Sequence, residues 1–203
     1  MNTLHKYEGK NLENLKNQCL EKLNVKEEEL YIFETEEEAG LFKGKKYILE
    51  AITKDEIISQ IRCFINDLAK NLNIEINSEI RIEDKNVNVL LVTENNNIMI
   101  GKDGKTLNAI QIVLRQYMKE LNKFGLRIIV DVGNYKNKRL KNLEYEVKKI
   151  CKEVLKTKVE VKLDPMNSYE RRKVHSIVGE FDSLESVSYG EDPNRYTVIR
   201  FKD

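Results

Sequence analysis

A four-residue stretch with glycine at both ends, Gly101-Lys102-Asp103-Gly104, is the part of the sequence best suited to hold an anion. Glycine lets the backbone approach a ligand closely, and a helix that starts directly afterwards presents free N–H groups and a favourable dipole. Lys102 and Lys105 add positive charge at the same place. The pattern therefore favours a phosphate–sugar backbone as the ligand, and the alternative is a plain Asp-Gly turn.

A nucleotide-binding P-loop is the rival interpretation, because Gly104-Lys105-Thr106 matches the end of the pattern G-x-x-x-x-G-K-[ST]. That pattern requires a glycine five residues before Gly104, where this sequence has Met99. The segment before the loop also does not have the pattern of a buried strand. Both departures argue against nucleotide hydrolysis by this loop.

A second set of polar side chains lies near the carboxyl end, at Arg171, Arg172 and His175. Arg171 and His175 are four residues apart and therefore share a face of the helix expected there. The arginine fork can bridge phosphate oxygens, and histidine can hydrogen-bond a phosphate or stack on a base. The alternative is a capped surface helix whose histidine packs against neighbouring strands.

The charge is distributed unevenly along the 203 residues, although the formal net charge is only +1. Residues 1–95 carry 13 Lys/Arg against 19 Asp/Glu, whereas residues 96–163 carry 16 against 7, and the remaining residues carry 6 against 8. A basic middle segment suits a surface that displaces counterions from phosphates. A solvated helix face is the alternative for the same charges.

Three cysteines and two histidines offer neither a disulfide framework nor a zinc site, so three buried, reduced thiols are expected. There is no paired catalytic motif, and we expect neither a cofactor nor an enzyme activity. No run of about 18 apolar residues is present, and the polar first ten residues lack a signal-peptide pattern, so a cytoplasmic location is expected.

Three α+β units are expected from the apolar patterning. The first (1–53) has the order strand, helix, strand, strand: its helix covers Asn11 to Leu23, and a glycine-bounded turn, Gly40 to Gly44, precedes the strand Lys46 to Ile52. The second (54–134) has a helix Lys54 to Leu72, strands Glu75 to Glu83 and Asn86 to Thr93, a short apolar helix, the glycine loop, a helix Thr106 to Leu121 and a strand Leu126 to Val132.

The third unit (135–203) starts with a long basic helix, Tyr135 to Lys156, and continues with a strand near Lys158 to Leu163. Its second helix, Ser168 to Val178, has Asn167 as N-cap and Glu170 as the partner in a capping box, and Gly179 as its stop. Two strands, Leu184 to Tyr189 and Tyr196 to Phe201, complete the unit.

The element order of the second unit resembles a KH domain of the prokaryotic type (type II), a fold that binds about four nucleotides of single strand. This resemblance implies that four apolar residues around the loop flank the nucleotide groove; they are Ile98, Ile100, Leu107 and Ile110. The alternative is that each of these side chains belongs to the core.

The carboxyl-terminal residues Pro165 to Arg172, His175 and Tyr189 to Arg195 resemble the Arg-x-x-x-His nucleic-acid-binding domain of the Jag family, the SpoIIIJ-associated or KhpB/EloR proteins. Asp131 to Tyr135, followed by Lys136, Lys138 and Arg139, resembles that family's connection out of its KH domain. The first unit resembles the Jag N-terminal domain. The family's loop is usually basic at both inner positions, so Asp103 is a departure that places a carboxylate beside the phosphate path.

The resemblance implies a single-stranded RNA-binding protein, with single-stranded DNA as a further ligand, that acts in post-transcriptional control linked to cell elongation and envelope synthesis. Gly101, Lys102, Gly104 and Lys105 would hold one stretch of backbone, and Arg171 with His175 another. Arg172, Lys136 and Arg139 would add electrostatic contacts. A small single-KH protein or a second copy of the chain are the protein partners that the resemblance allows. The alternative function is a protein–protein adaptor that docks through Glu36 to Glu38 and the adjoining Leu41 and Phe42.

Overall fold

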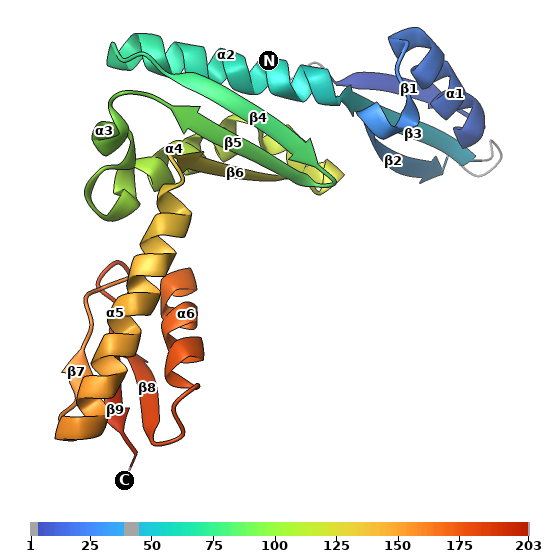
Figure 1. Ribbon diagram of the computed structural model, residues 1–203. Helices are drawn as coiled ribbons and strands as arrows, with labels where there is room; N and C mark the ends of the chain where they lie inside the picture. Colours follow the sequence, from blue (N-terminus) through green and yellow to red (C-terminus); the bar gives the residue numbers. More distant parts are fainter. Residues whose placement is uncertain (1–3, 39–44, 203) are drawn as a thin grey trace. The chain divides into compact units, whose positions relative to one another are not determined.

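The computed structural model describes residues 4–38 and 45–202 and divides the chain into two compact units, residues 1–133 and 134–203 (Figure 1). Each unit has its own sheets and helices. The architecture is α+β, as predicted, and three separate three-stranded sheets correspond to the three expected domains.

The N-terminal domain is a βαββ unit whose sheet has the strand order β1-β3-β2. One face of this sheet is packed against α1, around the buried side chains of Leu15, Cys19, Leu30, Leu49 and Ala51. The elements in chain order are β1 (His5–Gly9), α1 (Leu12–Leu23), β2 (Leu30–Glu38) and β3 (Lys45–Thr53). The predicted turn at Gly40 to Gly44 lies outside the described residues.

The next domain has a sheet in the order β4-β5-β6, in which β5 pairs antiparallel with β4 and parallel with β6. Parallel neighbours need a long crossover connection. This crossover carries two helices, with the glycine loop between them. The elements are α2 (Lys54–Leu72), β4 (Asn77–Glu83), β5 (Asn86–Val92), α3 (Asn96–Ile100), α4 (Lys105–Tyr117), a 3-10 segment (Lys119–Phe124) and β6 (Arg127–Val132).

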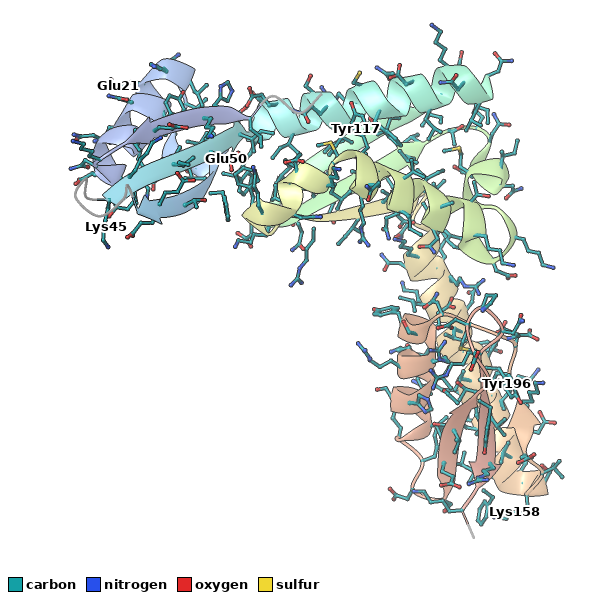
Figure 2. The ribbon with its side chains drawn as sticks, turned by 180° about the vertical axis from the view of Figure 1, so that it is seen from behind. Glu21, Lys45, Glu50, Tyr117, Lys158 and Tyr196 are labelled. Carbon is teal, nitrogen blue, oxygen red and sulfur yellow. The ribbon has the colours of Figure 1, made fainter. Side chains whose placement is uncertain are left out.

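These two domains of the first unit contact one another directly. Lys123 of the 3-10 segment forms an ion pair of 2.8 Å with Glu50 of β3, a residue labelled in Figure 2. Phe33 and Phe124 meet edge to face with ring centroids 6.4 Å apart. The open face of the N-terminal sheet is therefore partly covered by the domain that carries the glycine loop.

The second unit packs two helices on one face of the sheet β7-β9-β8, and Figure 1 shows α5 and α6 side by side. Its core contains Val147, Cys151, Val154, Val174 and Ile177. The elements are α5 (Tyr135–Thr157), β7 (Val161–Lys162), α6 (Ser168–Val178), β8 (Leu184–Tyr189) and β9 (Tyr196–Phe201).

Four expectations about elements and burial need correction. The helix predicted as Thr106 to Leu121 ends at Tyr117, although Leu121 remains buried in the 3-10 segment. Val113, expected on the buried side, is 55% exposed. The strand expected at Lys158 to Leu163 shrinks to two residues. Cys63 is exposed, whereas Cys19 and Cys151 are buried, and burial raises the pKa of both buried thiols.

Candidate nucleic-acid interface

The glycine loop forms a tight turn between α3 and α4 in which three residues have positive φ: Gly101 (70°), Asp103 (55°) and Gly104 (78°). Gly101 also has ψ of −179°, a combination that is essentially restricted to glycine. A Cβ at this position would lie 2.1 Å from Oγ1 of Thr106 and 3.0 Å from the Thr106 backbone nitrogen. Both the conformation and the close approach therefore require glycine here.

Asp103 and Gly104 complete the turn. Aspartate tolerates the left-handed region better than most residues, which gives a physical reason for Asp103 at a position with φ of 55°. The amide of Gly104 donates to the carbonyl of Gly101 at 3.3 Å, and α4 begins at the next residue. The first N–H groups of α4 have no partner within the helix, so they are available to an anion at the loop.

The side chains around the loop divide into an exposed and a buried group. Lys102 and Lys105 are exposed, Ile98 is 57% exposed and Ile100 is half-buried. Leu107 and Ile110, in contrast, belong to the core behind the loop, with 1% and 8% exposure. For these two residues the structure agrees with the core alternative, so only Ile98 and Ile100 reach the surface beside the lysines.

In the second unit, Arg171 is a buried residue of α6 with 7% exposure. Its Nη1 donates to the carbonyl oxygen of Met166 at 2.7 Å and to Oδ1 of Asp192 at 3.3 Å. These bonds connect the start of α6 to the loop between β8 and β9. The neighbouring Arg172 is exposed.

His175 lies one turn further along α6 and is hydrogen-bonded through both ring nitrogens. Nδ1 lies 2.6 Å from Oγ of Ser186, and Nε2 lies 2.9 Å from Oγ of Ser188. Ser188 continues the chain to Oγ1 of the fully buried Thr197 at 3.0 Å. Hydroxyl groups can donate or accept, so this chain can satisfy histidine in either tautomer. The alternative of a histidine packed against neighbouring strands is therefore what the structure shows for its ring.

The predicted capping box at the start of α6 is present. Asn167 accepts from the amide of Glu170, and the Glu170 carboxylate accepts from the amide of Asn167 at 3.1 Å. The same carboxylate, 6% exposed, forms an ion pair with Arg139 of α5. Burial lowers the pKa of Arg139, but the pair with Glu170 outweighs that effect and holds this pKa above its ordinary value.

The structure thus brings Arg139 to the Arg171–His175 helix, where it acts first as a partner of Glu170 and Tyr135. Lys136 is half-buried and also engaged in an interaction. The basic residues of the glycine loop belong to the other unit. The expected sites are consequently two separate clusters, one in each unit.

Two further features bear on the alternatives. Glu36, part of the acidic segment considered for protein docking, pairs with Lys45, while Leu41 and Phe42 lie outside the described residues. Among residues 4–38 and 45–202 no group of three or more His, Cys, Asp or Glu side chains is placed to hold a metal ion. None of the helices in this part of the chain is long and apolar enough to cross a membrane.

Comparison with known proteins gives two family matches and several relatives. Residues 64–134 match the KH domain model, and residues 141–201 match the model of the Arg-x-x-x-His domain. The chain is 31% identical to the RNA-binding protein KhpB of Clostridium symbiosum over 161 residues, which cover 78% of this chain and 72% of that protein. It is 27% identical to the RNA-binding protein KhpB of Bacillus subtilis over 200 residues, 96% of each chain. A shorter match, 37% identical over 62 residues, covers 30% of this chain and 15% of a protein of Acanthamoeba polyphaga mimivirus provisionally named a 3'-5' exonuclease.

Proposed function

The chain belongs to the KhpB family of RNA-binding proteins, and from that premise we propose that it binds single-stranded RNA through the glycine loop Gly101–Gly104. The observation that carries this proposal is the shape of the loop, which only glycine at Gly101 permits. The loop places two exposed lysines at the start of a 13-residue helix. Backbone amides and ammonium groups at one point are suited to phosphates.

The bases of the bound strand would lie against the two apolar residues that reach the surface, Ile98 and Ile100. Leu107 and Ile110 would support them from the core. Asp103 adds a negative charge on the phosphate side, so we expect the loop to bind more weakly than a loop with two basic inner residues. This arrangement predicts contacts with the backbone and little selection between bases.

The second proposed site is on α6, where the exposed Arg172 supplies positive charge and His175 offers its ring edge. Arg171 would act as a positioning residue, because its hydrogen bonds hold the loop that contains Asp192. Lys136 and Arg139 would contribute through their charge. Binding, and not catalysis, is the function proposed for both sites, in keeping with the names of the KhpB relatives.

The test of the loop is a comparison of the full chain with the variant Lys102→Glu/Lys105→Glu. Glutamate is favourable in the first turn of a helix, so the variant should fold normally. We expect its affinity for a short labelled single-stranded RNA to fall at least about tenfold at low salt, because two attractive contacts become repulsive.

The matched control is Arg62→Glu/Lys119→Glu, which changes the charge equally at two exposed positions of the same domain outside the loop. Its affinity should change much less. Equal losses in the two variants would show that binding depends on overall charge, and the loop would lose its proposed role.

A further inference from the structure

The solvent-facing side of α5 carries five lysines and one tyrosine in a single row. Successive members are three or four residues apart, which places them all on one face of a helix. This face is opposite to the core residues Val147, Cys151 and Val154. The residues of the row, called the basic row below, are Lys138, Lys141, Tyr145, Lys149, Lys152 and Lys156, and all of them are exposed.

The lysines of the basic row differ from other lysines of this unit in having no acidic partner. Lys148 and Lys173 both pair with Glu144, at 2.8 and 3.2 Å. No ion pair involves any of the five row lysines within the part of the chain that the structure describes. Glu146 and Glu153 lie along one border of the row, so the five lysines keep an excess of positive charge.

Tyr145 stands near the middle of the basic row with 74% of its surface exposed, the largest exposure among the large hydrophobic side chains of the described residues. Lys141 and Lys149 lie one helical turn before and after it. An exposed ring between cations is the combination with which proteins bind single-stranded nucleic acid, the ring stacking on a base and the cations contacting phosphates. With one ring and no aliphatic residue, the row lacks the broad apolar face by which a helix lies on a membrane.

We propose that the basic row is an additional RNA-binding track, in which the lysines contact successive phosphates and Tyr145 stacks on a base. This proposal rests on the proposed function and extends it to a surface outside the loop and the Arg171–His175 cluster. From Lys138 to Lys156 the row is roughly 27 Å long at ~1.5 Å per residue. That length corresponds to about eight stacked nucleotides at ~3.4 Å each.

The first test is the salt dependence of RNA binding by the full chain and by Lys141→Gln/Lys149→Gln/Lys152→Gln. Glutamine has nearly the helix propensity of lysine, so α5 should be preserved. With a 20-nucleotide single-stranded RNA, loss of three phosphate contacts should make the slope of log K against log salt shallower by about 2. With a five-nucleotide RNA, which the glycine loop can hold alone, the slope should not change.

The matched control is Lys10→Gln/Lys26→Gln/Lys70→Gln, which removes three charges from exposed positions of the first unit. Tyr145 is tested separately: Tyr145→Ala should weaken binding of the long RNA about tenfold, and Tyr145→Phe should leave it unchanged, because stacking needs only the ring.

Equal slopes for the row variant and the control would overturn the proposal, and so would an equal loss with the short and the long RNA. In either case, if binding still depends on Lys102 and Lys105, the proposed function stands and the row alone is refuted. If the unaltered chain binds no RNA at low salt, both proposals fail.

Discussion

At the scale of single residues, the loop depends on a backbone conformation that side chains rarely adopt. Gly101 combines φ of 70° and ψ of −179° with a close approach to Thr106. We expect Gly101→Ala to destabilise the first unit by about 1–3 kcal/mol, measured by denaturant unfolding, and to weaken RNA binding. Asp103→Asn serves as the comparison, because asparagine tolerates the left-handed region equally well. This change should leave stability nearly unaltered and tighten RNA binding a few-fold, and weaker binding by Asp103→Asn would contradict the proposed phosphate path.

Arg171 and Arg172 are adjacent but should respond differently to substitution. Arg171→Ala removes charged hydrogen bonds from a buried side chain, and we expect a loss of about 2 kcal/mol in the free energy of unfolding. Arg172→Ala should cost less than about 0.5 kcal/mol, as usual for an exposed position, while weakening RNA binding. Unfolding curves of the two variants provide the measurement, and similar stabilities would show that Arg171 does not position the loop.

The chemistry of these residues could be predicted from the sequence, but not their burial. The spacing of Arg171 and His175 correctly places them on one helix face, yet no local signal shows that this face is covered by Met166, Asp192 and the strand β8. The glycine loop was predictable because its conformation is set locally by two glycines. The basic row was visible only as a lysine-rich helix until the core residues defined which side of α5 is exposed.

At the scale of elements, the start of α6 is joined to α5 by the pair Glu170–Arg139. We expect Glu170→Ala to destabilise the second unit by about 3 kcal/mol, because it removes the capping box and leaves a partly buried arginine unpaired. Glu170→Gln keeps a side chain that can accept from Asn167 and should cost less. A double-mutant cycle with Arg139→Ala measures the coupling, and strictly additive losses would refute the proposed link.

The accuracy of the predicted helix ends follows the presence of caps. The bounds of α2 agree with the prediction because Thr53 and Glu56 form a capping box and Asn73 ends the helix in the left-handed region. The predicted end of α4 is four residues too late, since apolar periodicity continues through the buried Met118 and Leu121 although the backbone has changed to a 3-10 segment. Periodicity reports burial, and it does not distinguish the two kinds of helix.

At the scale of the whole molecule, the second unit has a core of its own, formed by residues of α5, α6 and the sheet β7-β9-β8. We expect a fragment of residues 134–203 to fold alone with a stability of roughly 3–5 kcal/mol, as for other domains of about 70 residues. Dispersed amide signals in an NMR spectrum and a cooperative melt would confirm it. A fragment of residues 147–203, which lacks Arg139 and Leu143, should be much less stable, and equal stability of the two would contradict the role given to the first half of α5.

The distribution of charge over the molecule follows its elements, with the basic segment extending from α3 through α5. Counting charges along the sequence is enough to find this segment. It could not separate lysines held in ion pairs, such as Lys123 and Lys148, from those left for a ligand.

The central claim, that the full chain binds single-stranded RNA at the glycine loop, is tested most directly by photo-crosslinking a thiouridine-containing RNA to the protein and mapping the linked peptides by mass spectrometry. We expect cross-links in the peptide that contains residues 98–105, reduced in Lys102→Glu/Lys105→Glu. Cross-links confined to the N-terminal domain, or a pattern unchanged by that variant, would contradict the account.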